Sequence, residues 1–286
     1  MPDLHEYKNK AIKVRPLLKW AGGKRQIVHH LISKLPEKFS VYYEPFFGAG
    51  ALFLELYNRG LLKKAVISDL NKELIALYTL VRDRCSGIIE ELENIRFTNN
   101  KDDYYRARDL FNSMESDHNP EKAALMIYLN RHAYNGLYRV NSSGKFNVPF
   151  GRYAHPSLPT PDDIISFSKA LSNVKIINKD FETAVSDATV SDFVYFDPPY
   201  APLSRSSDFS AYISQGFGLD EQKRLSRVFE ELSSRGVMVM ESNSATPFIK
   251  DLYRDYPLSV VQARRNINSK SNGRGKISEL IITNYH

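Results

Sequence analysis

The sequence predicts an α/β protein built on a mostly parallel sheet, with a helical segment inserted between two strands. Three observations carry this prediction. The short apolar run Phe193–Phe196 is typical of a strand buried on both faces, and Val174–Ile177 predicts another strand of the parallel type. A glycine-rich turn, Glu44–Gly50, follows the apolar run Val41–Tyr43, as in the opening of a nucleotide-binding βαβ unit. The pattern from Lys72 to Ala133 is helical and too long for one crossover helix.

Composition narrows the class of protein. With 42% hydrophobic and 25% charged residues, the chain of 286 residues resembles ordinary soluble globular proteins. It has no apolar run long enough for a membrane span, and Met1–Pro16 lacks the apolar segment of a secretory signal, so we expect a cytoplasmic protein. The only cysteine, Cys85, excludes a disulfide framework and a Cys-rich zinc site. The histidines show no metal-ligand spacing beyond the pair His29-His30, so we expect no metal.

The positive charge is concentrated in two segments. Arg131–His155 contains four lysines and arginines, and Arg264–Lys276 contains five, and neither segment contains an acidic residue. Since the net charge of the whole chain is +6, the remainder of the chain is net negative. Positive charge focused in this way favours a polyanionic partner.

The first motif is Leu17–Lys24, which precedes a helical pattern through about Leu35. Its glycine pair lets the backbone turn tightly, and the helix start together with Lys24 would bind a carboxylate or phosphate. Trp20 is the only tryptophan and lies close enough in sequence to stack on a ligand.

The second motif is the glycine-rich turn. Its glycine spacing is not the dinucleotide G-x-G-x-x-G, which disfavours a nicotinamide dehydrogenase and favours a cofactor without a pyrophosphate. Ala65–Ser68 predicts the next strand, and Asp69 follows it, 25 residues after Glu44. An acidic residue near that offset accepts hydrogen bonds from ribose hydroxyls; the alternative is that Asp69 is the N-cap of the next helix.

The inserted segment is expected to be helical, with breaks near Thr98–Asn100 and Asp117–Pro120. After it, the turn Asn141–Gly144 lies between two arms rich in β-formers, Tyr134–Val140 and Lys145–Tyr153, which predicts a hairpin. Aromatic and cationic side chains interleave along this hairpin. That mixture suits contacts to phosphates and bases, whereas a merely solvated hairpin would not need so many rings.

The remaining elements complete the sheet. We expect a helix at Leu219–Ser234, a fifth strand at Val237–Met240, and a helix near Pro247–Tyr253. Two last strands, Leu258–Val261 and Leu280–Thr283, are expected to pair as an antiparallel ribbon. The segment Ala201–Phe217 is rich in serine and aromatic residues and is placed to close over a substrate.

The third motif, Asp197-Pro198-Pro199-Tyr200, ends the fourth strand. Its prolines stop the strand and leave Asp197 at the carboxyl edge of the sheet, where open α/β sheets bind ligands. The Asp197 carboxylate and the Pro198 carbonyl would accept the two hydrogens of an exocyclic amine, and Tyr200 would stack on the base. The alternative is that these residues only end a strand.

The motifs together resemble the Dam-type DNA adenine methyltransferases, the GATC-methylating enzymes of class alpha. These enzymes transfer a methyl group from S-adenosylmethionine to the 6-amino group of adenine. The resemblance runs from about Leu17 to Tyr285 and rests on several motifs in the same order: Lys19–Lys24, Glu44–Gly50, Asp69, Asn130-Arg131, Tyr134–Leu137, Phe146–Tyr153 and Asp197–Tyr200.

The resemblance implies a Rossmann-like S-adenosylmethionine-dependent methyltransferase sheet with an inserted helical plus β-hairpin DNA-recognition domain. The catalytic domain would comprise residues 1–80 and 171–286, and the inserted domain residues 81–170. It also implies a monomer in solution that acts on double-stranded DNA. Lys179 replaces the glycine that often precedes the Asp-Phe pair in the family, so the local turn there is expected to differ.

The resemblance also implies roles for individual residues. Catalytic roles fall on Asp197, Pro198 and Tyr200. Contacts to S-adenosylmethionine fall on Trp20, Lys24, Glu44, Phe46, Gly48, Gly50, Asp69, Asp180, Phe181 and Asp197. Contacts to DNA fall on three groups of residues. Lys19 would contact the first guanine, and Tyr134 and Asn135 would wedge into the base stack. The residues that would read or flank bases are Leu137, Arg139, Pro149 and Tyr153.

Two other functions remain open at this point. A cytosine amino methyltransferase would share the cofactor pocket and differ in the base it accepts. A catalytically silent DNA-binding relative would keep the basic hairpin, although the intact Lys24 and Asp197 argue against it. A glutamine or RNA methyltransferase is disfavoured by aspartate rather than asparagine before the two prolines.

Overall fold

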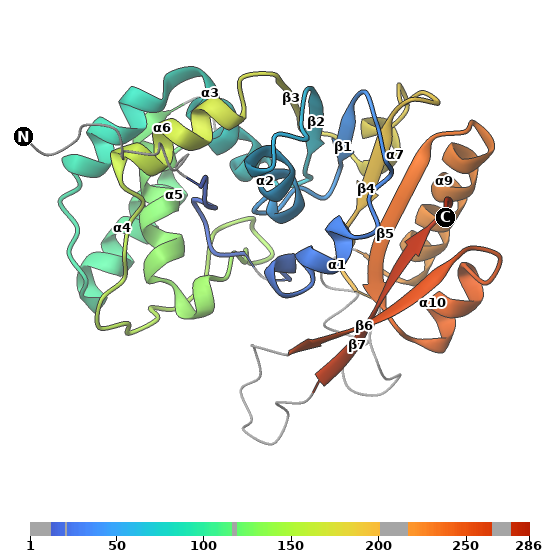
Figure 1. Cartoon of the computed structure of the whole chain (residues 1–286). Helices are drawn as coiled ribbons and strands as arrows, with labels where there is room; N and C mark the ends of the chain where they lie inside the picture. Colours follow the sequence, from blue (N-terminus) through green and yellow to red (C-terminus); the bar gives the residue numbers. More distant parts are fainter. Residues whose placement is uncertain (1–12, 21, 116–118, 201–216, 265–275) are drawn as a thin grey trace, which may run out of the picture.

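The structure is a computed structural model that describes residues 13–20, 22–115, 119–200, 217–264 and 276–286. The described residues form a seven-stranded sheet in the order β3-β2-β1-β4-β5-β7-β6 (Figure 1). The strands are β1 (Tyr42–Glu44), β2 (Ala65–Ser68), β3 (Val174–Ile177), β4 (Phe193–Phe196), β5 (Met238–Ser244), β6 (Leu258–Arg264) and β7 (Lys276–Thr283). Strands β1 to β5 pair in parallel, which confirms the predicted α/β class.

The last two strands pair in antiparallel fashion, as expected, but β7 lies inside the sheet between β5 and β6. Strand order reverses direction between β1 and β4, because β2 and β3 lie on one side of β1 whereas β4 and β5 lie on the other. In open α/β sheets a crevice for ligands forms at the carboxyl ends of the strands at such a switch point. Glu44 ends β1 and Asp197 follows β4, so both carboxylates belong to this edge.

The side chains of β4 alternate between the two faces of the sheet and are buried on both. Phe193 and Tyr195 of β4 join the core beneath α2 and α3, whereas Val194 and Phe196 pack with α7, α9 and α10. The helices are η1 (Lys24–Gln26), α1 (Val28–Ile32), α2 (Ala51–Asn58), α3 (Lys72–Glu93), α4 (Lys101–Ser113), α5 (Pro120–His132), η2 (Tyr134–Gly136), α6 (Pro161–Ala170), α7 (Phe181–Ala184), α9 (Leu219–Ser234) and α10 (Pro247–Leu252).

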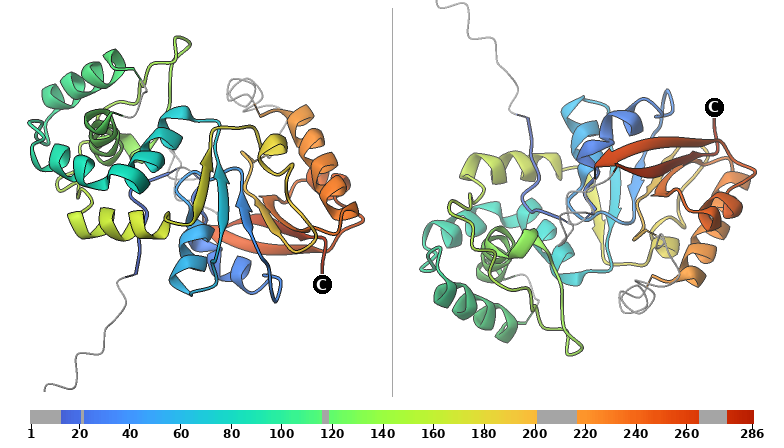
Figure 2. Two further views of the ribbon diagram at one scale, coloured as in Figure 1. Left: turned by 90° about the horizontal axis from the view of Figure 1, so that it is seen from above. Right: turned by 90° about the horizontal axis from the view of Figure 1, so that it is seen from below.

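Helices α3 to α6 gather beside the sheet rather than on top of it (Figures 1 and 2). The expected breaks are confirmed, because asparagine side chains cap the start of each of the first three: Asn71 for α3, Asn100 for α4 and Asn119 for α5. Helix α3 carries one residue with non-helical dihedrals, Arg84. The expected domain boundary between residues 80 and 81 therefore falls inside α3, shortly before the kink at Arg84.

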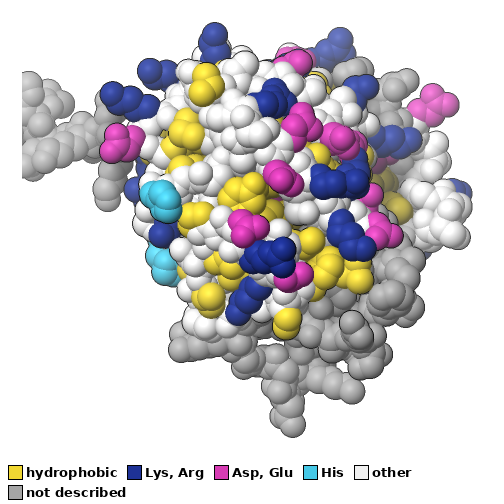
Figure 3. Space-filling view, turned by 90° about the vertical axis from the view of Figure 1, so that its right-hand side faces the viewer, with side chains coloured by type: hydrophobic (Ala, Val, Ile, Leu, Met, Phe, Trp, Pro, Cys, Tyr) yellow, Lys and Arg dark blue, Asp and Glu magenta, His cyan; other side chains and the backbone are white. Residues whose placement is uncertain are grey.

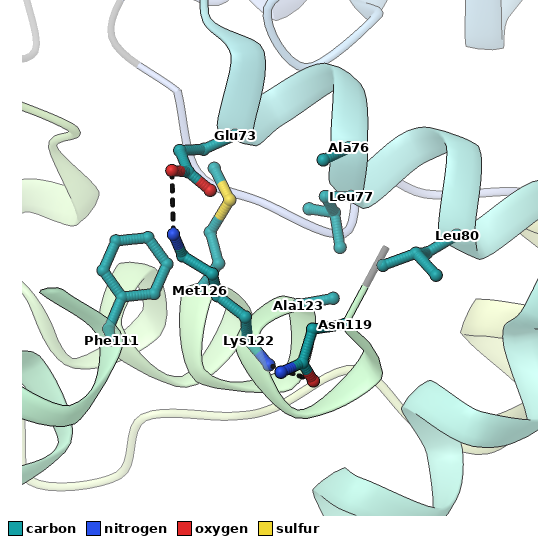
Figure 4. A pocket seen from close by; sticks show the side chains of 9 residues that line it. All are labelled: Glu73, Ala76, Leu77, Leu80, Phe111, Asn119, Lys122, Ala123 and Met126. Carbon is teal, nitrogen blue, oxygen red and sulfur yellow. Dashed lines mark hydrogen bonds and ion pairs between the residues drawn. The ribbon is translucent and has the colours of Figure 1, made fainter. Parts of the chain in front are cut away.

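A buried ion pair fixes α5 against α3. The Lys122 ammonium lies 2.9 Å from the Glu73 carboxylate (Figure 4). It also donates a hydrogen bond to the backbone carbonyl of Met114. The cavity beside this pair measures about 10 Å³, enough for about one water molecule and too small for a cofactor. It is lined by Glu73, Ala76, Leu77, Leu80, Phe111, Asn119, Lys122, Ala123 and Met126. We therefore regard it as part of the packing of the insert.

Two sequence expectations need correction in detail. The helix expected from Lys24 to Leu35 is a 3-10 turn followed by the short α1, and Ile27 between them is not helical. Proline at position 36 disfavours helical dihedrals at Leu35, which explains the early end. The hairpin arms form only two isolated bridges, Val140 with Phe146 and Ala133 with Phe150, so the hairpin is an irregular loop pair rather than a ribbon.

Candidate functional site

Asp197 lies at the carboxyl end of β4 and is held from two sides. Its carboxylate lies 2.7 Å from the Lys24 ammonium and accepts a hydrogen bond of 3.0 Å from the Ser242 hydroxyl on β5. Burial raises the pKa of Asp197, and the nearby Lys24 and Ser242 act in the opposite direction. The carboxylate side chain keeps 19% of its surface exposed, so it is anchored without being sealed from a substrate.

Tyr200 is fixed by both its hydroxyl and its ring. Its hydroxyl donates a hydrogen bond of 2.7 Å to the Glu279 carboxylate on β7. The Lys24 ammonium lies 4.3 Å from the centroid of the Tyr200 ring, a cation–π contact. Lys24 itself is buried, and its ammonium also donates to the backbone carbonyl of Gly22. The expected catalytic residue Asp197, the expected cofactor residue Lys24 and Tyr200 therefore form one cluster.

The glycine-rich turn packs tightly under Trp20. Gly48 and Gly50 both have positive φ, at 49° and 66°. A Cβ on Gly48 would lie 2.8 Å from the Trp20 ring, and a Cβ on Gly50 would lie 2.5 Å from the Phe47 ring. Glycine is therefore required at both positions for the backbone and for the close approach of the rings.

Asp69 binds this turn and does not cap the next helix. Its carboxylate accepts hydrogen bonds from the backbone amide of Gly48, at 3.0 Å, and from that of Asn71, at 2.9 Å. The N-cap of α3 is Asn71 instead. The alternative role considered for Asp69 is therefore wrong, and the residue is left half-buried beside the turn.

Glu44 is more deeply buried than the other expected cofactor residues. It is 3% exposed, and it accepts a hydrogen bond of 2.9 Å from the Tyr42 hydroxyl. Burial raises the pKa of Glu44 well above its usual range. It lies behind the turn, so its structural contacts are to the strand and to the start of α2.

A group of aromatic rings includes Phe46 of the glycine-rich turn. Phe46 stacks on Phe181 at a centroid distance of 5.4 Å and meets Phe217 edge-on at 5.5 Å. The Arg224 guanidinium of α9 lies over the other side of this group, 4.1 Å from the Phe181 centroid, and pairs with Asp180. Asp180 also caps α7, so Asp180 and Phe181 are both already engaged by protein contacts.

These residues fit S-adenosylmethionine by their chemistry. Lys24 supplies a cation for a carboxylate. The Asp69 carboxylate can accept from ribose hydroxyls, and Trp20 and Phe46 present apolar rings next to the turn.

The expected DNA-contacting residues form a second cluster on the insert. The Lys19 ammonium lies 4.3 Å from the centroid of the Tyr153 ring. The backbone amide of Tyr134 donates to the Pro149 carbonyl, and the Arg139 guanidinium donates to Asn147. All seven of these residues are exposed or half-buried: Lys19, Tyr134, Asn135, Leu137, Arg139, Pro149 and Tyr153. The other basic segment, Arg264–Lys276, lies largely outside the described residues, as do most of Ala201–Phe217.

Asn130 joins this cluster to the first motif, a role that the sequence did not reveal. Its side chain accepts from the Lys19 amide at 2.8 Å and donates to the carbonyls of Lys19, at 2.8 Å, and Gly136, at 3.0 Å. The neighbouring Arg131 donates to the carbonyls of Pro16 and Leu17. Together they bind residues 16–19 to the end of α5.

Ser242 and Glu279, which anchor Asp197 and Tyr200, were also missed. A signal existed for Ser242, because strand β5 changes from apolar to polar residues at its carboxyl end, beside β4. Polar residues at that edge are candidates for a site. Nothing local marked Glu279, whose position depends on the pairing of β7 with β5.

The face formed by α9 and α10 differs from the basic hairpin. Figure 3 shows acidic and basic side chains interspersed on that face, and ion pairs such as Lys223 with Asp220 and Arg235 with Glu231 account for part of this pattern. Within the part of the chain that the structure describes, no group of three or more His, Cys, Asp or Glu side chains is arranged to hold a metal. Among the described helices, none is long and apolar enough to cross a membrane.

Comparison with known proteins gives one family and several relatives. Residues 20–267 match the family described as D12 class N6 adenine-specific DNA methyltransferase. The chain is 45% identical to the type II methyltransferase M1.LlaDCHI of Lactococcus lactis subsp. cremoris, over 97% of this chain and 98% of that one. It is 40% identical to the type II methyltransferase M.MjaIII of Methanocaldococcus jannaschii, and the match covers 96% of this chain and 100% of that one. It is 36% identical to the DNA adenine methylase of Escherichia coli strain K12, and the match covers 94% of this chain and 95% of that one.

Proposed function

The chain belongs to the D12 class N6 adenine-specific DNA methyltransferase family, and from this premise we propose that it methylates GATC in duplex DNA with Asp197 as its catalytic carboxylate. The enzyme transfers a methyl group from S-adenosylmethionine to the 6-amino group of adenine, as membership of the family requires. Because the family is adenine-specific, adenine rather than cytosine is the target base. The GATC site rests on the match of the recognition residues Lys19, Leu137 and Arg139 to the Dam-type pattern.

The observation that carries the assignment of Asp197 is its ion pair with Lys24. This contact places the carboxylate between the first motif and Tyr200, at the switch point of the sheet. A residue that only ended a strand would not need an anchored, partly exposed carboxylate beside a buried lysine. Trp20 of the same first motif lies against Gly48 of the glycine-rich turn, so this motif contacts both the turn proposed for the cofactor and the residue proposed for catalysis.

The cofactor would be held by residues of the first two motifs. Lys24 would bind the methionine carboxylate, Asp69 the ribose hydroxyls, and Phe46 and Phe181 would lie against the adenine ring. The turn containing Gly48 and Gly50 would lie under the methionine portion. When bound, S-adenosylmethionine supplies an electrophilic methyl group on its sulfonium.

The chain's own part in the chemistry is to prepare the amine. The lone pair of the 6-amino nitrogen is delocalised into the ring, so the nitrogen is a poor nucleophile. The Asp197 carboxylate and the Pro198 carbonyl would each accept one N–H, which favours a tetrahedral nitrogen with its lone pair free for direct in-line attack. Asp197 would take up the proton that the amine loses once the new N–C bond has formed.

The target base would have to leave the helix, at a cost of a few kcal/mol. Stacking on the face of Tyr200 away from Lys24 would offset about 1–3 kcal/mol of that cost. Tyr134 and Asn135 would fill the gap in the stack. Asn135 has a positive φ of 55°, which holds the two side chains at a tight turn exposed to solvent.

We assign DNA recognition to the inserted residues 81–170 and catalysis to residues 1–80 and 171–286. The enzyme acts on DNA, and we place it with the DNA in the cytoplasm or nucleoid, as a monomer. A gel-filtration or light-scattering mass well above 32.8 kDa for the free protein would contradict the monomer.

Methylation of a plasmid followed by mapping of the modified adenines tests the proposal. We expect N6-methyladenine at GATC and background levels elsewhere. Methylation at a different adenine sequence would overturn the proposed site, and the absence of any methylated adenine would overturn the activity. A protein with Asp197→Ala should leave the plasmid unmodified.

A further inference from the structure

The loop that carries the proposed catalytic residues is held by a buried chain of hydrogen bonds. The side-chain amide of Gln222, on α9, donates a hydrogen bond of 2.8 Å to the carbonyl oxygen of Pro199. The side-chain oxygen of Gln222 accepts a hydrogen bond of 2.9 Å from the side-chain amide of Asn243. The same amide donates a second hydrogen bond, of 2.8 Å, to the Glu241 carboxylate. The other Glu241 oxygen accepts 2.6 Å from the Tyr253 hydroxyl. This series of hydrogen bonds therefore links the core beneath α10 to the catalytic loop.

All four side chains behind the loop are removed from solvent. Gln222, Glu241, Asn243 and Tyr253 are each 0% exposed. Burying polar groups is costly unless their hydrogen bonds are made, and these bonds satisfy them. The buried amide of Asn243 is itself oriented, because its oxygen accepts 2.8 Å from the backbone amide of Ser244. This fixes which end of Gln222 faces the loop.

The bond to Pro199 bears on its neighbours because of proline geometry. Only two backbone rotations separate the carbonyls of Pro198 and Pro199, and the ring of Pro199 locks one of them. Fixing the direction of the Pro199 carbonyl therefore limits the direction of the Pro198 carbonyl. It also limits where the chain enters Tyr200, whose hydroxyl is anchored independently on Glu279.

We propose that Gln222 is a positioning residue for methyl transfer, which aims the Pro198 carbonyl at the target amine by holding the Pro199 carbonyl. Asn243 and Glu241 orient Gln222 from behind. The inference rests on the proposed function, in which the Pro198 carbonyl accepts a hydrogen bond from the adenine amine. Gln222 touches neither adenine nor cofactor in this proposal.

Three variants of α9 separate positioning from structural support. Gln222→Glu keeps the shape of the side chain and can accept from Asn243, but an ionised carboxylate cannot donate to Pro199. Burial can raise the pKa of a glutamate to about 8–9, so the rates of all variants are measured at about pH 9.5, where this carboxyl group is ionised. Gln222→Leu removes both bonds. Ser226→Ala, on the same helix, loses only a bond to its own backbone turn and is the control.

Four measurements on each full-length variant form the test, and a fifth follows base extrusion. They are the melting temperature, the Kd for S-adenosylhomocysteine, the Kd for a GATC duplex, and the methyl-transfer rate in a single turnover with saturating enzyme and cofactor. Base extrusion is followed by fluorescence of 2-aminopurine at the target position. That base lacks the 6-amino group, so its signal does not depend on the Pro198 carbonyl.

We expect both Gln222 variants to lose about 10- to 100-fold in single-turnover rate, the scale of a misplaced reacting group. Both Kd values should stay within about threefold of wild type, and the 2-aminopurine signal should persist. Ser226→Ala should match wild type throughout. If Gln222→Leu folds poorly, Gln222→Glu decides.

A Gln222→Glu protein that transfers methyl groups within about threefold of the wild-type rate would overturn the inference. So would a rate loss matched by equal losses in both Kd values and in melting temperature, because that pattern indicates general structural damage. Failure of the proposed function looks different, since the wild-type protein would then leave GATC unmodified.

Discussion

The indole ring of Trp20 stacks on the phenol ring of Tyr138, with centroids 5.7 Å apart and planes inclined by 23°. Tyr138 stands between Leu137 and Arg139, two of the residues expected to read bases. Trp20 lies against Gly48 of the glycine-rich turn, and the backbone amide of Gly48 donates to the Asp69 carboxylate. One stacked pair therefore joins the segment that would read DNA to the residues that would hold the cofactor.

Tyr138→Ala should weaken binding of S-adenosylhomocysteine by about two- to tenfold, because an aromatic pair contributes about 0.5–1.5 kcal/mol beyond its buried area. Tyr138→Phe keeps the stack and should retain most of the affinity. Trp20 is the only tryptophan, so its fluorescence reports this contact directly, and calorimetry measures the Kd. Val140→Ala, an exposed position two residues on, is the control. Equal affinities for Tyr138→Ala and wild type would show that the stack does not support the cofactor site.

Asp197→Asn should reduce the single-turnover methyl-transfer rate by at least about 100-fold, because the amide is a weaker acceptor and cannot take up the proton. DNA affinity should change little, since the recognition cluster lies on the insert. Asp187→Asn removes the same charge from an exposed side chain and should be fully active.

The measurement is incorporation of labelled methyl groups into a GATC duplex, paired with a DNA-binding titration. Asp197→Ala leaves the buried Lys24 ammonium without its carboxylate and should also lower the melting temperature. An Asp197→Asn protein with the wild-type transfer rate would refute the catalytic role of this carboxylate.

Glu241 predicts a pH dependence of stability. Burial raises its pKa from 4.5 to about 7, and the hydrogen bonds from Tyr253 and Asn243 and the charge of Asp197 modify this shift. A carboxyl group with a raised pKa stabilises the fold below pH 4.5, and this contribution is lost as pH rises to about 7. Its size is about 3 kcal/mol at most.

Glu241→Gln removes this titration. The free energy of unfolding of the variant minus that of wild type should therefore increase from pH 5 to pH 8. Urea denaturation of both proteins at the two pH values measures it, and other groups that titrate in both proteins, such as Glu44, largely cancel in the difference. A difference that stays constant between the two pH values would mean that Glu241 does not titrate in this range.

The sequence predicted most of the sheet and the first layer of the site, because both depend on local patterns. Asp197 follows one apolar strand and Gly48 follows another. The carboxyl ends of parallel strands lie at the same edge of a sheet, so the two residues were expected to lie close together. The polar end of β5 marked Ser242 as a candidate, but Glu279 and Gln222 could not be assigned in this way. Their contacts with the catalytic loop depend on which strands and helices become neighbours, and no local pattern encodes that choice.

The errors have similar causes. Ile27 fits a helical pattern, yet its side chain is 1% exposed in the core and its backbone leaves the helix. Tertiary packing overrides local periodicity there. The hairpin turn at Asn141–Gly144 was predicted from its residues, but the arms form only isolated bridges because Phe146 and Phe150 pack against α4 instead of pairing regularly.

Arg139 and Lys145 should affect DNA binding in different ways. Arg139 is held by hydrogen bonds to the side chain and backbone of Asn147, whereas Lys145 lies exposed at the hairpin tip. Arg139→Ala should relax discrimination at one base pair of GATC by about 1–3 kcal/mol. Lys145→Ala should weaken binding to all sequences alike and reduce the salt slope by about one. Titrations of cognate and single-mismatch duplexes at several salt concentrations measure both effects, and identical profiles for the two variants would contradict the division.

Gly136 and Gly144 give a matched pair that tests how Lys19 is placed. Both glycines have positive φ, at 60° and 74°, so alanine strains the backbone at either position. A Cβ on Gly136 would lie 2.4 Å from the Cβ of Lys19, whereas a Cβ on Gly144 would meet open space.

Gly136→Ala should therefore displace Lys19 and lower the preference for GATC over a duplex altered at the first guanine. Gly144→Ala should lose only about 1 kcal/mol of stability and keep that preference. Binding titrations with the two duplexes, together with urea denaturation, measure preference and stability separately. If both variants keep the wild-type preference, the contact between Gly136 and Lys19 does not set the reading of the first base pair, and Lys19 would have to be positioned by Asn130 alone.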